Sequence, residues 1–170
     1  SFAQEVPAFM VKKSVPGFFS SFAADNLGNI YPITTDNQLK KYNTKGDSMG
    51  VFNNLRKYGK LSYIDVTNPL KTLLFYKDFR TILVLDRFLN VVNNIDLRKQ
   101  NVFQVRAIAL AYDNNIWVFD EQDSQLKKIG EDGRFISGTA DLRLVLDEAP
   151  VPVSIFDQNG YVYMYDPQKG

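Results

Sequence analysis

The sequence predicts an all-β protein made of short antiparallel strands that recur along the chain, and three observations lead to this prediction. Aromatic residues make up 14% of the 170 residues, with 13 Phe and 9 Tyr, and such side chains suit the pleated surface of a strand. Short apolar segments are separated by Asn, Asp and Gly, which dominate turns. One strand–turn–strand pattern also returns at a nearly constant spacing.

The pattern is clearest around three aspartates, Asp25, Asp113 and Asp157. The segments that surround them, at residues 23–31, 111–119 and 155–163, read AADNLGNIY, AYDNNIWVF and IFDQNGYVY. The aspartates are 88 and 44 residues apart, which correspond to two periods and one period. A further unit should therefore lie near residue 69, where residues 67–69 supply a turn between two apolar segments.

Each full unit is predicted to contain four strands. In the second and third units these are residues 61–66, 72–76, 81–85 and 91–95, and residues 107–112, 116–120, 125–129 and 134–139. Asp132-Gly133 joins the last two strands of the third unit, and Asp-Gly is preferred where both central residues of a turn need positive φ. We place the units at residues 18–55, 60–98, 104–142 and, incomplete, 150–170.

Four antiparallel strands that recur every 40 to 45 residues or so are typical of the blades of a β-propeller. One four-stranded sheet cannot bury both of its faces alone, so neighbouring blades must cover them. About three and a half blades fit into this chain, whereas propellers have roughly four to eight. We therefore expect these blades to be part of a larger ring, completed by further residues, a second copy or a larger partner. A β-sandwich with coincidental spacing is the alternative fold.

The first blade motif carries the clearest family resemblance. Asp25, Gly28, Asn29, Ile30 and Tyr31 resemble the short blades of NHL and gluconolactonase-like propellers. The resemblance covers residues 18–167 and bears on architecture far more than on ligand. It implies one alternative function, a calcium-dependent hydrolase of the six-bladed, lactonase-like type that holds its metal in the central channel.

Absent residue types narrow the chemistry. The chain has no Cys and no His, which excludes disulfides, thiolate nucleophiles and the Ser-His-Asp and Cys-His hydrolases. The predicted channel-facing strands, residues 19–23 and 108–112, hold no Glu or Asp. We therefore expect no catalytic residue, no metal site, no cofactor and no enzyme activity. The net charge of +1 gives no basis for nucleic-acid binding, and no apolar run reaches the length that spans a membrane.

Three further patterns have structural interpretations. The aspartates that begin turns are assigned to turn chemistry rather than to calcium binding. Trp117 is assigned to packing between blades rather than to sugar stacking. Lys40-Lys41 and Lys127-Lys128 recur at matching places and are assigned to solvated edge strands, where lysine hinders aggregation, rather than to a basic patch. A carbohydrate-binding module with Tyr and Phe rims is a third functional alternative.

Residues 1–17 lie outside the repeat. Ser1 and Ala3 are small residues at positions −3 and −1 of a signal-peptidase cleavage before Gln4, and this segment resembles the signal-peptide ends of Bacteroidota envelope proteins. We expect an exported protein in the periplasm or at the outer membrane, and the resemblance extends to accessory proteins of the type IX secretion system. The apolar residues 8–11 are either a docking strand or part of a disordered leader.

An open arc of blades leaves one sheet face bare at each end, and both ends are rich in aromatic residues. The predicted interface residues are Phe18, Phe19, Phe22, Tyr161, Tyr163 and Tyr165. Exposed apolar patches of this kind mark interfaces. We therefore predict a non-catalytic binding or scaffold protein whose partners are envelope or outer-membrane proteins.

Overall fold

The computed structural model describes residues 10, 11 and 13–169, and they form antiparallel strands in four sheets. Within this part of the chain, the helical elements are two short 3₁₀ helices, η1 (Leu97–Gln100) and η2 (Leu142–Leu144). The strands are β1 (Phe19–Ala24), β2 (Ile30–Thr34), β3 (Leu39–Tyr42) and β4 (Ser48–Phe52) in the first blade, β5 (Tyr63–Asn68), β6 (Lys71–Tyr76), β7 (Thr81–Asp86) and β8 (Val91–Asp96) in the second, β9 (Val105–Leu110), β10 (Ile116–Asp120), β11 (Gln125–Ile129) and β12 (Phe135–Gly138) in the third, and β13 (Ser154–Gln158) and β14 (Tyr161–Tyr165) in the fourth.

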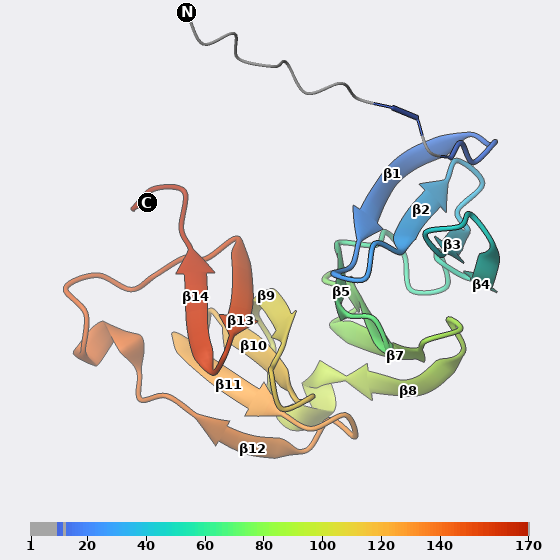
Figure 1. Cartoon of the computed structure of the whole chain (residues 1–170). Helices are drawn as coiled ribbons and strands as arrows, with labels where there is room; N and C mark the ends of the chain where they lie inside the picture. Colours follow the sequence, from blue (N-terminus) through green and yellow to red (C-terminus); the bar gives the residue numbers. More distant parts are fainter. Residues whose placement is uncertain (1–9, 12, 170) are drawn as a thin grey trace, which may run out of the picture.

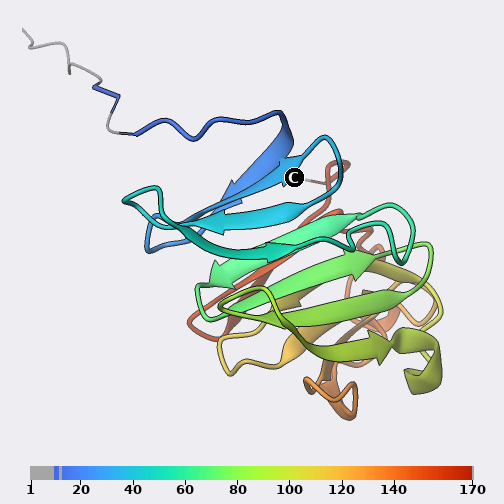
Figure 2. The same cartoon turned by 90° about the vertical axis from the view of Figure 1, so that its right-hand side faces the viewer.

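The sheets form an open arc of blades (Figure 1). In each full blade the four strands pair in chain order, with the first strand on the concave side of the arc and the fourth on its convex side. Figure 2 shows the strands of the first blade lying over those of the second. The predicted β-propeller fold, with three full blades and half of a fourth, is confirmed, and the β-sandwich alternative is wrong because there are four sheets.

Apolar clusters fill the three junctions between neighbouring blades. Leu74 packs with Tyr31 of the first blade, whereas Leu73, next to it in β6, packs with Val118 of the third. Successive residues of a strand point to opposite faces of the sheet, so every inner blade is apolar on both sides. We call the side of a blade that looks toward the next blade in the chain its forward face, and the other side its backward face.

Six hairpin turns share one five-residue design. The N–H of the first residue donates to the carbonyl of the fifth, and the N–H of the fourth donates to the carbonyl of the first. The fourth residue has positive φ, at 78° in Gly28, 67° in Leu89 and 67° in Asn114. The first residues of these turns are Asp25, Thr34, Asn43, Asp86, Ala111 and Gly130. Glycine enters the left-handed region without a Cβ clash, and Asn tolerates it better than most residues.

These turns correct the register of the predicted repeat. Asp25 is the first residue of its five-residue turn, and the first residue of the matching turn in the third blade is Ala111. Asp113 is the third residue of that turn, so it is not equivalent to Asp25. Asp157 precedes a tighter turn, in which Asn159 and Gly160 both have positive φ. The strand predicted at residues 107–112 also begins and ends two residues earlier, as Val105–Leu110. The predicted turn chemistry of the aspartates is nevertheless confirmed, since each carboxylate accepts a turn N–H.

Candidate functional site

Polar side chains tie each blade to the next, and Lys41 of β3 makes the first tie. Its ammonium donates to the carbonyl oxygens of Pro69, at 2.7 Å, and Arg87, at 3.1 Å, both in turns of the second blade. Only 3% of Lys41 is exposed, and this burial lowers the pKa of its ammonium. The prediction of a solvated edge lysine is therefore wrong for Lys41.

The lysine pair of β11 is also buried. β11 lies between β10 and β12, so it is an inner strand and needs no protection against edge pairing. Lys127 donates to Asp120 at 2.6 Å, and Lys128 donates to Asp113 at 2.7 Å. The prediction of solvated edge lysines is wrong for this pair, because β11 is not an edge strand. Each buried ammonium instead has a carboxylate partner, as a buried charge requires.

Asp65 of β5 ties the second blade to the third. One of its carboxylate oxygens accepts the N–H of Leu110 in β9 at 2.8 Å. The other accepts the backbone N–H of Thr67 at 2.9 Å and the hydroxyl of Thr67 at 2.7 Å. Asp65 is buried, so this carboxylate holds a buried N–H across the junction. The sequence motif did not single out Asp65, which lies before the predicted turn of its unit.

Trp117 of β10 ties the third blade to the fourth. Its indole N–H donates to the carboxylate of Asp157 at 2.8 Å, and its ring packs against the cluster that contains Phe119 and Ile155. The ammonium of Lys128 lies 4.5 Å from the centroid of the indole ring. The predicted packing of Trp117 between blades is confirmed.

Among the described residues, no blade lies against the forward face of the fourth blade. Val162 and Met164 point backward and pack against the third blade, so the residues that alternate with them point forward. In β14 these are Tyr161, Tyr163 and Tyr165, and in β13 Phe156 joins them because it lies opposite Tyr163. All four side chains are exposed. The rings of Phe156 and Tyr163 stack with their centroids 4.8 Å apart and an angle of 8° between their planes. We call these four residues the aromatic end face.

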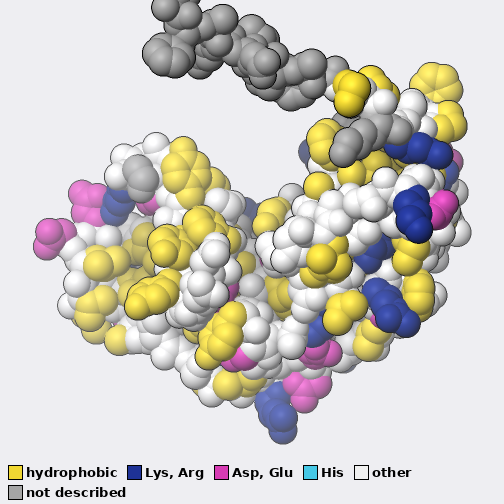
Figure 3. Space-filling view, viewed as in Figure 1, with side chains coloured by type: hydrophobic (Ala, Val, Ile, Leu, Met, Phe, Trp, Pro, Cys, Tyr) yellow, Lys and Arg dark blue, Asp and Glu magenta, His cyan; other side chains and the backbone are white. Residues whose placement is uncertain are grey.

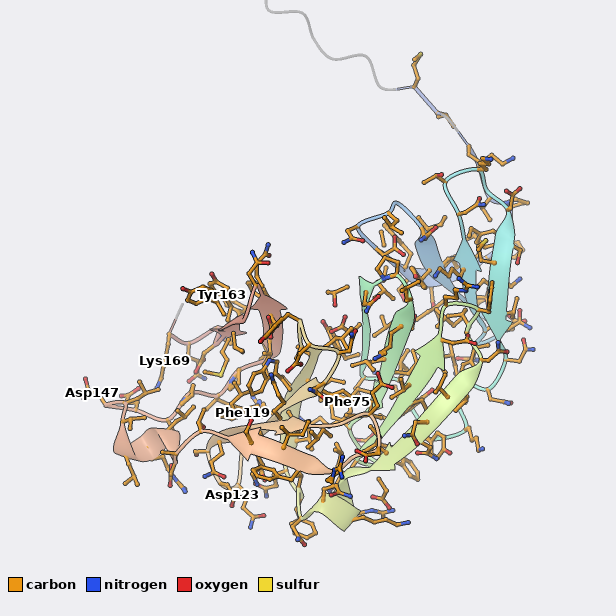
Figure 4. The ribbon with its side chains drawn as sticks, turned by 60° about the horizontal axis from the view of Figure 1, so that its bottom comes forward. Phe75, Phe119, Asp123, Asp147, Tyr163 and Lys169 are labelled. Carbon is orange, nitrogen blue, oxygen red and sulfur yellow. The ribbon has the colours of Figure 1, made fainter. Side chains whose placement is uncertain are left out.

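Phe119 and Tyr163 show the difference between a covered and an uncovered forward face. Figure 4 places Tyr163 at the open end of the arc and Phe119 among the sheets. None of Phe119 is exposed, whereas 48% of Tyr163 is exposed. Phe156 was missed by the sequence prediction, although it stands directly opposite Tyr163 in the β13–β14 pair. The sequence signal for Phe156 was its position next to the apolar Ile155, because neighbouring residues of a strand point to opposite faces of the sheet.

The other predicted interface residues lie at the first end of the arc. Phe18, Phe19 and Phe22 are all exposed, and 76% of Phe22 is exposed. Phe22 alternates with Ala23, which packs toward the second blade, so Phe22 lies on the backward face of the first blade. The structure therefore does not bring the six predicted residues into one patch. Apolar side chains gather at both ends of the arc, which are separated by an open gap (Figure 3).

A hollow of about 710 Å³ lies where the turns between the first and second strands of all four blades converge. Its lining includes Asp25, Asn68, Tyr112, Asn114 and Asp157. The carboxylate of Asp25 is already bound within its own blade, where it accepts from the side-chain amide of Asn29 at 2.7 Å and from the hydroxyl of Tyr31 at 2.9 Å. The hollow therefore offers mainly neutral polar groups and two aromatic rings, those of Tyr112 and Phe156.

Two features bear on the alternative of a calcium-dependent hydrolase. Burial raises the pKa of Asp25, but the hydrogen bonds from Asn29, Tyr31 and Leu27 together lower it by more, so the net effect is a lowered pKa. The carboxyl is therefore ionised at neutral pH. Within residues 10, 11 and 13–169, no three His, Cys, Asp or Glu side chains gather as metal ligands would.

In the same residues, no helix is long and apolar enough to cross a membrane.

No protein-family model matches the chain, and no curated protein matches it. Solved structures do match it. Virginiamycin B lyase from Staphylococcus aureus has a TM-score of 0.58 and 11% identity, over 85% of this chain and 47% of that chain. The β-propeller domain of Cps50 (Swd1) from Myceliophteria thermophila has a TM-score of 0.59 and 10% identity, over 86% and 49%. YCF48 bound to D1 peptide has a TM-score of 0.52 and 9% identity, over 79% and 44%.

These similarities show the fold alone, because the identities are low. The chain is similar to β-propellers and spans about half the length of the structures that it matches. The matched proteins include a lyase and the propeller domain of Cps50, so the fold is compatible with both catalytic and non-catalytic roles.

Proposed function

We propose that this chain is a non-catalytic scaffold of a bacterial envelope that binds a protein partner through its aromatic end face. One observation carries the proposal. At the three junctions within the chain, the forward face of a blade is buried by the next blade, whereas the forward face of the fourth blade exposes four aromatic rings.

The composition of the aromatic end face suits protein recognition. Tyrosine is enriched among the residues that dominate binding energy, because a large apolar ring is combined with a polar hydroxyl. Tyr163 and Phe156 are already stacked on each other, so fewer side-chain conformations are lost when a partner binds. Burial of each ring contributes about 25 cal/mol for every Å² of apolar surface removed from water.

Other support comes from a protein of similar fold and from the start of the sequence. YCF48 was solved bound to a D1 peptide, which is consistent with a protein-binding role for a propeller. The envelope assignment depends on Ser1 and Ala3 as a signal-peptidase site, and these residues lie outside the described part of the chain. The finer proposal is a partner within an outer-membrane or type IX secretion assembly. The non-catalytic assignment depends on the lack of Cys and His.

A photo-crosslinking experiment tests the proposed function. Tyr163 is replaced by p-benzoylphenylalanine, and the protein is irradiated in an envelope extract from a Bacteroidota host. We expect a covalent adduct whose protein component is identified by mass spectrometry. The matched control carries the same group at Phe79, an exposed residue in the β6–β7 turn of the second blade. If the probe at position 163 reacts no more than the probe at position 79, the proposed function is wrong.

A further inference from the structure

We infer that the hollow where the turns between the first and second strands converge binds a neutral oligosaccharide. All four blades line it, and each contributes at least one asparagine, at Asn26, Asn68, Asn114 and Asn159. Its volume of about 710 Å³ lies within the range of roughly 300–1,000 Å³ that is usual for the sites of small ligands. The inference goes beyond the proposed function, which concerns a protein partner on the aromatic end face, and does not depend on it.

The charges in the lining favour a neutral ligand over an anionic one. Among the described residues that line the hollow there are two carboxylates, Asp25 and Asp157, and no lysine or arginine. Like charges repel, so the hollow disfavours phosphates and carboxylates. Asp157 accepts the indole N–H of Trp117 at 2.8 Å and the backbone N–H of Gly160 at 3.1 Å. A carboxylate has about four acceptor sites, so Asp157 can still accept the hydroxyl groups of a neutral ligand.

Amide side chains supply the hollow with donors and acceptors. Asn26, Gln158 and Asn159 are all exposed. Asn114 accepts a hydrogen bond at 2.9 Å from the side-chain amide of Asn68 in the neighbouring blade, which holds the amide of Asn114 and leaves its two N–H groups as donors. Each hydroxyl of a sugar both donates and accepts, so neighbouring hydroxyls can pair with the oxygen and nitrogen of such amides.

The turns present side chains to the hollow rather than free backbone groups. The N–H of Asp25 donates to the carbonyl of Asn29 at 3.1 Å, and the N–H of Ala111 donates to the carbonyl of Asn115 at 2.8 Å. An extended peptide that adds to a sheet is bound mainly through unpaired main-chain groups of an edge strand. Because these turns bond their own backbone, the hollow suits a ligand dense in hydroxyl groups better than it suits a peptide.

Tyr112 supplies an apolar surface for one face of a sugar ring. Its side chain is 68% exposed, yet it is held from two sides. The ammonium of Lys128 lies 5.4 Å from the ring centroid, and a Cβ at Gly160 would lie 3.4 Å from the Cε1 of Tyr112. A ring that is already held loses little side-chain freedom when a ligand stacks on it. The C–H groups on the face of a sugar carry partial positive charge, which the negative face of an aromatic ring attracts.

Isothermal titration calorimetry with three neutral hexasaccharides, maltohexaose, cellohexaose and chitohexaose, tests the inference. We expect at least one of them to bind saturably, with a dissociation constant below about 1 mM. Hexagalacturonic acid, which carries a carboxylate on every ring, should bind at least about tenfold more weakly. Fluorescence gives a second measurement, because the single tryptophan of the chain, Trp117, donates to Asp157 in the lining. Its emission should change with the same midpoint.

Two substitutions remove the proposed sugar contacts. Tyr112→Ala removes the ring, and Asn159→Gly removes an amide at a residue whose φ of 53° suits glycine. Each should raise the dissociation constant by about tenfold, whereas Tyr112→Phe keeps the ring and should bind as the wild type does. The matched controls are Phe79→Ala, at an exposed ring, and Asn101→Gly, at another asparagine of positive φ. Both lie outside the lining and should leave binding unchanged, and circular dichroism checks that each variant is folded.

Three results would overturn the inference: no saturable binding of any neutral hexasaccharide, tighter binding of hexagalacturonic acid, or unchanged binding by both Tyr112→Ala and Asn159→Gly. A p-benzoylphenylalanine probe at position 112 tests for a protein in the hollow. If this probe forms an adduct with the same protein as the probe at position 163, the hollow holds part of the protein partner and the inference is wrong.

The two proposals can fail separately. Binding of a hexasaccharide without any adduct at position 163 supports the sugar site and contradicts the proposed function. An adduct at position 163 without binding of any hexasaccharide supports the proposed function and contradicts the sugar site.

Discussion

Strands β10 and β14 are the second strands of neighbouring blades, yet they meet opposite environments. The forward residues of β10, Trp117 and Phe119, are packed against the fourth blade, and those of β14, Tyr163 and Tyr165, meet water. The chemistry differs accordingly, because the covered positions hold a half-buried indole and a buried phenyl ring, whereas the exposed positions hold phenols. A phenol keeps an apolar ring for contact and a hydroxyl that water solvates. The aromatic end face is therefore suited both to contact with water and to burial under a partner.

The largest expected effect is a difference between β10 and β14 in how much each strand contributes to the free energy of unfolding. Phe119→Ala removes a fully buried ring from the junction, and such truncations cost about 3–5 kcal/mol of unfolding free energy. Tyr163→Ala, at an exposed position, should change the unfolding free energy by less than about 0.5 kcal/mol in the isolated chain. Urea denaturation followed by circular dichroism measures both. Equal losses from the two substitutions would mean that the aromatic end face is part of the core.

A smaller effect is expected from the buried carboxylate of Asp65. Asp65→Ala leaves the buried N–H of Leu110 without its acceptor, at a cost of about 2–3 kcal/mol. Hydrogen exchange at Leu110 should accelerate relative to Val118, whose backbone pairs stay within the third blade. Asp65→Asn keeps an acceptor oxygen and should recover part of the loss. If Asp65→Ala is as stable as the wild type, the carboxylate does not hold the junction.

The tie between the third and fourth blades is expected to be weaker still. Trp117→Phe keeps an aromatic ring but removes the N–H that donates to Asp157, so the unfolding free energy should fall by about 1 kcal/mol. A double-mutant cycle with Asp157→Ala isolates the coupling between the two residues. A coupling energy indistinguishable from zero would contradict this contact.

The smallest effect concerns pH. The net lowering of the pKa of Asp25 means that its ionised form stabilises the fold. The contribution is fully present above the ordinary carboxyl pKa, about 3.9, and is lost as the pH falls through the lower pKa of the folded state. The stability difference between the wild type and Asp25→Asn should therefore shrink in acid. Tyr31→Phe, which removes one donor to Asp25, should show an intermediate pH dependence, and urea denaturation across acid pH measures all three.

Much of the fold could be predicted because its signals are local. Alternation and turn residues place β10 and β11 at the residues that the structure shows, since strand period and turn chemistry depend on neighbours in the sequence. The register between blades could not be predicted in the same way. Asp25 and Asp113 look equivalent in sequence, but Ala111 opens the turn that matches Asp25, because the design of the turn depends on hydrogen bonds rather than on one residue type.

The candidate site was only partly predictable for a related reason. Tyr161, Tyr163 and Tyr165 alternate along one short strand, so the sequence shows that they share a face. Phe156 joins them only through cross-strand pairing. The buried role of Lys41 depends on carbonyl groups 28 and 46 residues further along the chain. Contacts of that range come from the packing of whole blades, which composition and local pattern do not reveal.

The ties between blades also set an order of events while the chain is being made. Lys41 leaves the ribosome 28 residues before Pro69 and 46 residues before Arg87, whose carbonyl oxygens will accept its hydrogen bonds. Trp117 likewise precedes Asp157 by 40 residues. At about 5–20 residues per second, each nascent blade waits for seconds with its forward face uncovered. Each full blade therefore passes through a state in which its forward face meets water before the next blade is made.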